Sequence, residues 1–88
     1  MDHAICREGD ETSHGGKVIR VSGSMEIDGH HNARLGDWVS CPAHGDNPIT
    51  EAGAMLDEGV PIVVHRCRTA CGSLVIASGD MTISDQEA

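Results

Sequence analysis

The chain has 88 residues and a formal net charge of −8, and one Trp is its only large aromatic residue. The length predicts a single domain, residues 1–88, and the scattered Lys and Arg residues form no basic stripe, which argues against nucleic acid and an anionic membrane surface as partners. No apolar run approaches the roughly 18 residues of a membrane-spanning helix, so we expect no stable membrane insertion.

So small a chain can form only a small hydrophobic core. A chain of this length buries only about 60–65% of the surface that its unfolded form exposes, and without Phe or Tyr the core must consist of Val, Ile, Leu, Met and Ala. A structural metal can contribute about 10–16 kcal/mol of folding free energy, which would stabilise such a core. The four Cys residues could instead form two disulfides in a secreted protein, but no leader sequence precedes them, and metal ligation is favoured.

Short strands are predicted along the chain after a frayed polar start at Met1 to Ile5. Three β-branched runs recur: Val18–Val21, Ile49–Thr50 and Leu74–Ile76. Each leads through a glycine to a short alternating run: Met25–Ile27, Met55–Asp57 and Met81–Ile83. Asp28-Gly29 and Glu58-Gly59 then predict hairpins, because a type I′ turn needs positive φ at both central residues. The density of glycine argues against long helices.

These runs align as three copies of one pattern, roughly residues 5–29, 30–59 and 60–84, with a polar tail at 85–88. In this alignment His14, Cys41 and Cys71 fall at the same place. A copy this small cannot bury its own apolar face and must pack on its neighbour. We therefore predict an all-β domain of three β-hairpin repeats related by pseudo-threefold symmetry, with the three ligand-bearing loops converging at one end.

Four side chains form the candidate metal site: His14, Cys41, His44 and Cys71. Pro42 stiffens the turn between Cys41 and His44, which are three residues apart. Four N and S ligands with no open position are typical of a structural zinc site, and thiolate with imidazole favours zinc or iron over calcium or magnesium. The alternative for Cys71 is a small buried hydrophobic side chain.

Other polar positions receive structural interpretations. Cys6 is expected in the core, Cys67 is either buried or a spare thiol, and the adjacent His30 and His31 are expected at the surface. Asp10 and Asp37 each follow a glycine and predict turns in which the Asp side chain accepts a hydrogen bond from backbone N–H. The arginines three residues before them either pair with these aspartates or stay in solvent.

No arrangement of residues predicts catalysis. A hydrolytic zinc site needs an open ligand position and a positioned general base, and the chain has no His-Glu-x-x-His helix. No Ser/His/Asp constellation and no phosphate-binding glycine loop before a helix is present. We therefore predict that the chain is not an enzyme. A small zinc- or iron-binding redox or electron-transfer module is the alternative, because of the spacing Cys67-x-x-x-Cys71, although the usual Cys-x-x-Cys is missing.

From about Ile5 to Ser84 the motifs and their order resemble the PAAR-repeat proteins, which sharpen the tip of the bacterial type VI secretion spike. The sequences Ser-His-Gly-Gly, Cys-Pro-x-His-Gly and Ala-Cys-Gly occur at 13–16, 41–45 and 70–72. His31-Asn32-Ala33-Arg34 occupies the place of the Pro-Ala-Ala-Arg motif, with Ala33 and Arg34 kept. The third copy departs from the pattern, because Val64-His65-Arg66-Cys67 lacks its Arg and Gly-Asp.

The resemblance implies a cone-like β domain with a metal near its apex, held typically by three histidines and one cysteine. His65 is therefore the alternate ligand to Cys71. It also implies a structural protein that caps a trimeric VgrG-type spike, one copy per trimer, and to which effectors can attach. Such a protein would be in the bacterial cytoplasm before firing and would then leave through the type VI apparatus. The residues that bind the spike are not identified by the sequence.

Overall fold

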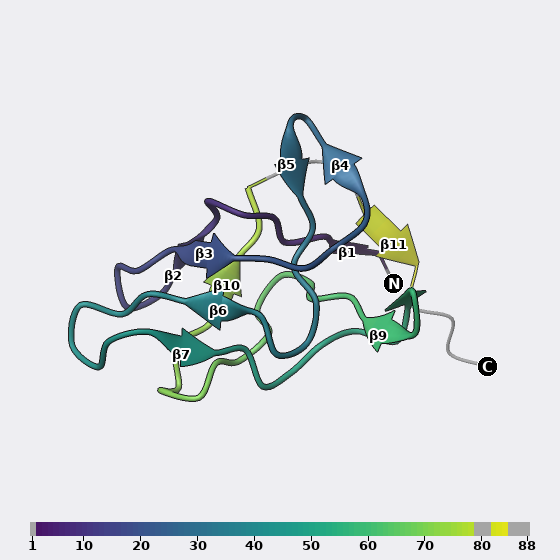
Figure 1. Ribbon diagram of the computed structural model, residues 1–88. Helices are drawn as coiled ribbons and strands as arrows, with labels where there is room; N and C mark the ends of the chain where they lie inside the picture. The colour runs from purple at the N-terminus through teal and green to yellow at the C-terminus, as the bar shows by residue number, and fades with distance from the viewer. Residues whose placement is uncertain (1, 79–81, 85–88) are drawn as a thin grey trace.

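Tight turns divide the described part of the chain, residues 2–78 and 82–84 of the computed structural model, into eleven strands of two or three residues, and no helix occurs in it (Figure 1). The strands are β1 (Asp2–Ala4), β2 (Glu11–Thr12), β3 (Val18–Arg20), β4 (Glu26–Ile27), β5 (His30–His31), β6 (Trp38–Val39), β7 (Asn47–Pro48), β8 (Leu56–Asp57), β9 (Val60–Pro61), β10 (Val75–Ile76) and β11 (Thr82–Ser84). The predicted all-β domain is confirmed. No helix in the described residues is long and apolar enough to cross a membrane.

All strand pairs are antiparallel, and most are short. β3, β6 and β7 form a three-stranded sheet, and the remaining pairs are β1–β11, β2–β10, β4–β5 and β8–β9. Isolated backbone bridges connect these pairs to one another. The cone-like outline and the boundaries of the three copies remain predictions.

Both predicted hairpins are confirmed. β4 pairs with β5 and β8 pairs with β9, and the turn residues have positive φ at both central positions: Asp28 54°, Gly29 84°, Glu58 54° and Gly59 86°. Positive φ at both positions is the requirement of a type I′ turn, whose twist matches that of the flanking strands.

The expected fraying of the first residues is wrong for Asp2–Ala4. These residues form β1, which pairs with β11 in the register Asp2↔Ser84 and Ala4↔Thr82. Of the third alternating run, Thr82 and Ile83 belong to this pair, whereas Met81 and the tail 85–88 lie outside the described residues. The two ends of the described chain thus form a strand pair that corresponds to the hairpins β4–β5 and β8–β9 of the other copies.

Three equivalent residues, one per copy, form a closed cycle of backbone hydrogen bonds. The Cys6 N–H donates to the Val63 carbonyl at 3.0 Å, the Val63 N–H to the Ala33 carbonyl at 3.0 Å, and the Ala33 N–H to the Cys6 carbonyl at 2.9 Å. All three residues are fully buried. The cycle lies where the three segments meet. Its three residues are spaced along the chain as the sequence motifs are.

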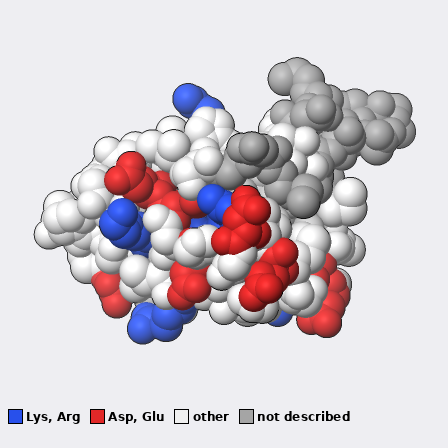
Figure 2. Space-filling model, turned by 90° about the horizontal axis from the view of Figure 1, so that it is seen from above, with Lys and Arg blue, Asp and Glu red and all other residues white. Residues whose placement is uncertain are grey.

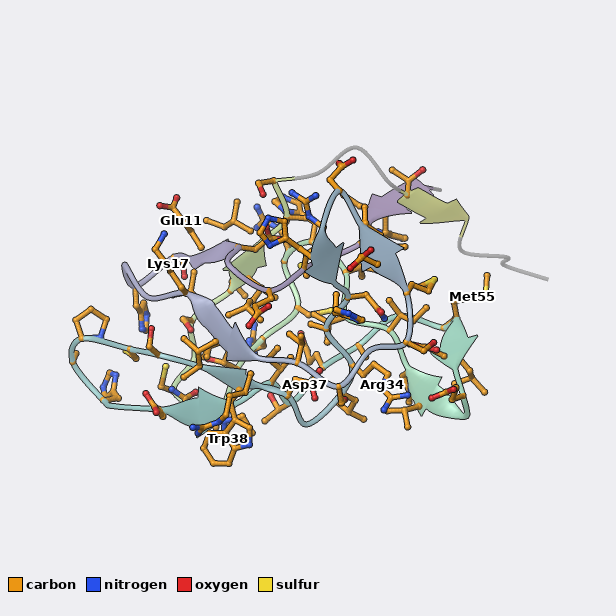
Figure 3. All side chains as sticks on the ribbon, turned by 45° about the horizontal axis from the view of Figure 1, so that its top comes forward. Glu11, Lys17, Arg34, Asp37, Trp38 and Met55 are labelled. Atoms are coloured by element: carbon orange, nitrogen blue, oxygen red, sulfur yellow. The ribbon has the colours of Figure 1, made fainter. Side chains whose placement is uncertain are left out.

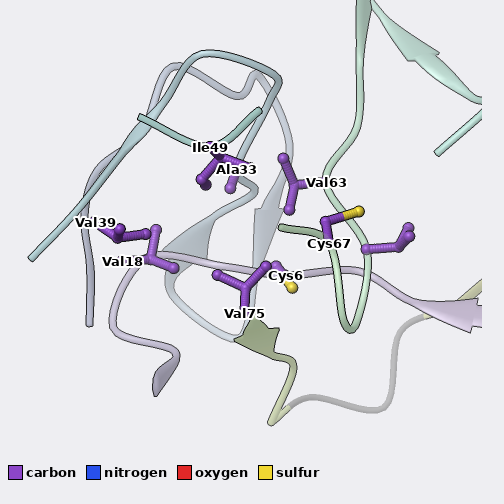
Figure 4. Packing of buried hydrophobic residues seen from close by; sticks show 9 residues of the cluster. Cys6, Val18, Ala33, Val39, Ile49, Val63, Cys67 and Val75 are labelled. Carbon is purple, nitrogen blue, oxygen red and sulfur yellow. The ribbon is translucent and has the colours of Figure 1, made fainter. Parts of the chain in front are cut away.

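The main core surrounds this cycle and is built from small and β-branched side chains (Figure 4). Its buried members are Cys6, Val18, Ala33, Val39, Ile49, Val63, Val64, Cys67 and Val75. Ile5, Ile27 and Ile62 form a second cluster. The expectation that Leu and Met would contribute to the core is wrong for Leu35, Met55 and Leu56, which are exposed, whereas Met25 is partly buried against the second cluster. The space between three converging segments admits only compact side chains.

Asp10 and Asp37 hold equivalent turns, as predicted. Asp10 Oδ2 accepts a hydrogen bond from the Arg7 N–H at 2.8 Å, and Asp37 Oδ2 accepts one from the Arg34 N–H at 2.7 Å. Both aspartates are buried. Burial is tolerated because each carboxylate also accepts a hydrogen bond from the hydroxyl of a serine, Ser78 for Asp10 at 2.5 Å and Ser22 for Asp37 at 2.7 Å.

The two guanidinium groups do not pair with these aspartates directly but donate to the same serines. Arg34 Nε donates to Ser22 Oγ at 3.1 Å, and Arg34 Nη1 donates to the Asp57 carbonyl at 2.9 Å; Figure 3 shows Arg34 next to Asp37. Arg7 repeats this with Ser78 Oγ and the Ile27 carbonyl. We call each set an Arg–Ser–Asp network. Each joins two copies, since Ser22 of the first copy bonds to Arg34 of the second, and Ser78 of the third copy bonds to Arg7 of the first.

A further buried carboxylate connects the β8–β9 hairpin to the first copy. Asp57 accepts hydrogen bonds from the Ser24 hydroxyl, from the Ser24 N–H at 2.8 Å and from Asn32 Nδ2 at 3.1 Å. The Ser24 hydroxyl, followed by the Ser24 N–H, lowers the pKa of Asp57 below its ordinary value. The carboxylate is therefore charged at neutral pH and accepts all three bonds.

One backbone position differs among the copies. Gly9 and Gly36 both have a φ of 92°, and the equivalent third position is Arg66, with a φ of 73°. Their N–H groups donate to Val18, Ile49 and Val75 carbonyls, respectively. The hydrogen bonds thus require a left-handed backbone that glycine adopts freely and that costs a residue with a side chain about 1–2 kcal/mol.

We expect Arg66→Gly to raise the free energy of unfolding by about 1 kcal/mol, because it removes this backbone strain. The greater conformational entropy of glycine in the unfolded chain offsets part of this gain. The measurement is denaturant unfolding at a fixed excess of metal. Arg68→Gly, the same change at an exposed position without positive φ, is the control and should not stabilise. Equal or lower stability of Arg66→Gly would show that Arg66 is unstrained.

Candidate metal centre

Three loops, one from each copy, contribute the candidate ligands. His14 lies between β2 and β3, Cys41 and His44 lie between β6 and β7, and Cys71 precedes β10. In Figure 1 the β2–β3 and β6–β7 loops lie at the end of the molecule away from the β8–β9 hairpin. The structure therefore brings together four residues that are separated by up to 57 positions in sequence.

The donor atoms lie at separations that suit one metal ion. The Cys41 sulfur is 3.4 Å from His44 Nδ1 and 3.8 Å from His14 Nδ1, and the Cys71 sulfur is also 3.8 Å from His14 Nδ1. One donor atom from each of the four residues lies within 4.8 Å of all the others. A zinc tetrahedron with Zn–S bonds of about 2.3 Å and Zn–N bonds of about 2.0–2.1 Å has S···N edges of about 3.5 Å. The group therefore could hold a metal ion.

Backbone pairing between the loops fixes their relative positions. The Ser40 N–H donates to the Lys17 carbonyl at 2.8 Å, and the Ser13 N–H donates to the Leu74 carbonyl at 2.8 Å. Gly16 makes the first contact close, because a Cβ at this position would lie 1.8 Å from the Ser40 carbonyl oxygen. Glycine at position 16 is thus required for the loop of the first copy to approach the loop of the second.

Polar neighbours prepare Cys71 as a ligand. The Cys71 sulfur lies 3.4 Å from Thr69 Oγ1 and 3.5 Å from Ser73 Oγ, and the Cys71 N–H donates to Asn47 Oδ1 at 3.1 Å. The hydroxyls of Thr69 and Ser73 lower the pKa of the Cys71 thiol to about 5. Cys71 is therefore a thiolate at neutral pH, which is the form that binds metal.

Thr69, Ser73 and Asn47 are the site residues that sequence reasoning missed. Thr69 and Ser73 also bond to each other at 2.7 Å. A signal for Thr69 was available, because Thr12 occupies the equivalent position in the first copy, where its hydroxyl accepts a hydrogen bond from the Gly16 N–H. No signal in the sequence indicated Asn47, whose contact depends on the packing of the second loop against the third.

The other Cys and His candidates lie elsewhere. His65 is not part of the four-residue group, and its Nδ1 accepts a hydrogen bond from the Ala77 N–H at 3.1 Å. Cys6 and Cys67 are buried in the main core, where burial raises the pKa of both thiols. His30 and His31 are exposed, as predicted.

Chemically, two thiolates and two imidazoles suit zinc. Cys41 is buried, Cys71 is partly buried, and both histidines are exposed. Four protein donors on one ion would fill a tetrahedron, which is the composition of a structural zinc site. The two-and-two composition differs from the three histidines and one cysteine that the resemblance implies.

The family model described as the PAAR motif matches residues 8–77, which include all four candidate ligands. No curated protein sequence matches the chain.

We expect one metal ion per chain in native mass spectrometry and unfolding of the chain when a chelator removes it. A structural zinc contributes about 10–16 kcal/mol, which equals or exceeds the whole stability of a typical domain, about 5–15 kcal/mol. Thermal melting with and without chelator measures this. A folded chain with an unchanged melting temperature after complete metal removal would contradict it.

Matched variants assign the ligands. Cys41→Ser and Cys71→Ser should lose the ion or bind it far more weakly. Cys67→Ala and His65→Ala should retain a full equivalent, because these side chains lie outside the four-residue group. Retention by Cys71→Ser together with loss by His65→Ala would instead make His65 the ligand.

Proposed function

This chain belongs to the PAAR-motif family, whose members are structural components of type VI secretion spike tips, and we propose that it caps a trimeric VgrG-type spike. The match over residues 8–77 carries this proposal. One molecule would sit on the threefold axis of the trimer. The chain would act mechanically and not as an enzyme.

The recurrent backbone contacts support a threefold partner. Cys6, Ala33 and Val63 make the same hydrogen bond to one another in turn, so a single chain presents three similar but non-identical sides. A trimeric β-helix ends in three identical strand edges with unpaired backbone N–H and C=O groups. A molecule of this kind can cover all three edges by adding strands through main-chain hydrogen bonds, which tolerate unlike side chains.

The strand pairs away from the candidate metal centre would offer the surfaces for such pairing. β4–β5, β8–β9 and β1–β11 are each two-stranded in the described structure. We propose that strand edges at this end dock on the spike, and that zinc stiffens the loops at the other end, which leads into the target envelope. Effectors would attach at that narrow end. The protein would assemble in the bacterial cytoplasm and leave through the apparatus.

The alternative of a redox or electron-transfer module is less well supported. It rests on the pair Cys67 and Cys71, but Cys67 lies in the core with its pKa raised by burial, whereas Cys71 belongs to the metal group. A thiol whose pKa is raised is a poor nucleophile in disulfide exchange, because the thiolate is the reactive form.

We expect one copy of this chain per spike trimer when the protein is co-expressed with the VgrG-type protein of its own organism. Native mass spectrometry or mass photometry of the purified complex counts the copies. Three copies per trimer, or no complex, would refute the capping proposal and leave a metal-binding module with another partner.

Two variants that add the same charge locate the docking end. Leu56→Lys, on the exposed face of β8, should weaken capture of the spike, because a lysine would be desolvated against it. Ala43→Lys, on the exposed loop between Cys41 and His44, should leave capture unchanged. The reverse result would place the spike at the metal end.

A further inference from the structure

One of the three junctions between copies lacks the Arg–Ser–Asp network. The Cys67 N–H donates to the Val64 carbonyl, as the Asp37 N–H donates to the Arg34 carbonyl, so Val64 and Cys67 occupy the places of the arginine and the aspartate. Ala52 precedes Gly53 as Ser22 precedes Gly23, and both glycines make the equivalent backbone bond. Valine, cysteine and alanine thus replace all three members of the network.

A hollow of about 390 Å³, open to solvent, lies at this junction. Its lining includes Ala52, Gly53, Val64 and Cys67, which we call its apolar wall. Val64 and Cys67 are buried, and the Cys67 thiol is neutral because burial raises its pKa. The volume lies within the range of about 300–1,000 Å³ that ligand sites occupy. Val64 stands here in place of the long guanidinium side chain that the other two junctions hold.

Arg66 and His65 supply hydrogen-bond donors at the rim, and His3 also lines the hollow. Arg66 lines the hollow and is exposed, and its guanidinium makes no hydrogen bond or ion pair within the described residues. His65 also lines it; because its Nδ1 accepts the Ala77 N–H, its Nε2 bears the proton and can donate. Glu51 is the acidic group of the lining, and its Oε1 is engaged by the Arg68 N–H at 2.9 Å.

The backbone conformation of Arg66 costs folding free energy. It occupies a left-handed position that is glycine in the other two copies, and residues held in such conformations tend to be found where they serve a function. The protein has a net charge of −8, and acidic side chains spread over the face in Figure 2. Arg66, which makes no ion pair within the described residues, therefore places a positive charge beside the apolar wall on an acidic molecule.

We propose that this hollow binds a short acidic segment of a partner protein, in which an apolar side chain enters the hollow and an adjacent Asp or Glu carboxylate pairs with Arg66 and His65. The apolar wall matches the side chain, and the rim matches the carboxylate. Because the hollow is open, a segment that continues over the surrounding surface gains contacts that a free small carboxylate does not. The site does not depend on the proposed spike-capping function.

The test is NMR titration of the metal-loaded, ¹⁵N-labelled chain with capped peptides. A peptide with the centre Leu-Glu is expected to give saturable shifts of the Gly53, Arg66 and Cys67 amides. Two matched peptides, Leu-Gln and Ala-Glu, should bind more weakly, because one lacks the charge and the other lacks the apolar side chain. Equal affinity of the Leu-Glu and Leu-Gln peptides, or the absence of saturable shifts with all three, would overturn the proposal.

Free 4-methylpentanoate tests the source of the carboxylate. It should bind more weakly than the Leu-Glu peptide. Binding as tight as that of the peptide would overturn the assignment to a protein segment and would instead indicate a site for a small carboxylate.

Two variants test the parts of the site. Arg66→Gly keeps the left-handed backbone and removes the cation. It should weaken binding of the Leu-Glu peptide by up to about fivefold, which is the range for one exposed ion pair. Binding of the Leu-Gln peptide should not change. The triple variant Ala52→Ser, Val64→Arg, Cys67→Asp rebuilds the network of the other two junctions and should abolish binding. Unchanged binding by Arg66→Gly, which does not depend on the triple variant folding, would contradict the proposal.

Discussion

The fold depends on the closed cycle of backbone hydrogen bonds among Cys6, Ala33 and Val63. These residues are fully buried, and a buried N–H without a partner costs as much as a lost hydrogen bond or more. In the cycle each residue donates to one of the others and accepts from the third, so no segment can shift by one residue without breaking two of the three buried bonds. The register of the three segments is therefore set at the centre, and the side chains around it must fit what remains of the space.

Closure at the centre also determines both ends. Because the three segments have the same register, the loops that follow them meet at one end and bring His14, Cys41 and Cys71 together. The hairpins that precede them lie away from these loops (Figure 1), and β1 and β11 pair across nearly the whole length of the chain. A metal at the first end would cross-link the three loops that the backbone cycle has already aligned, which makes its contribution one of rigidity as well as of folding free energy.

Much of this follows from the sequence, and what does not follow depends on contacts between distant segments. The Asp28-Gly29 and Glu58-Gly59 turns are local, and three of the four candidate ligands stand at matching places of a repeat, so both features could be predicted. The strand β1 was not, because its partner lies about eighty residues away. Nor was the role of the serines, since Ser22 bonds to an aspartate of the next copy. Leu and Met were misplaced for a related reason: the crowding around the cycle is a property of three segments and not of one.

The backbone cycle explains why the three junctions can differ in chemistry. Two junctions hold an Arg–Ser–Asp network, and the third holds Ala52, Val64 and Cys67 with a hollow beside them. If side chains held the copies together, loss of a whole network at one junction would separate two copies. The main-chain bonds persist at that junction, where the Val63 N–H still donates to the Ala33 carbonyl. Side chains at the junctions are thus free to diverge, and a chain with threefold backbone contacts can present one side that is chemically unlike the other two.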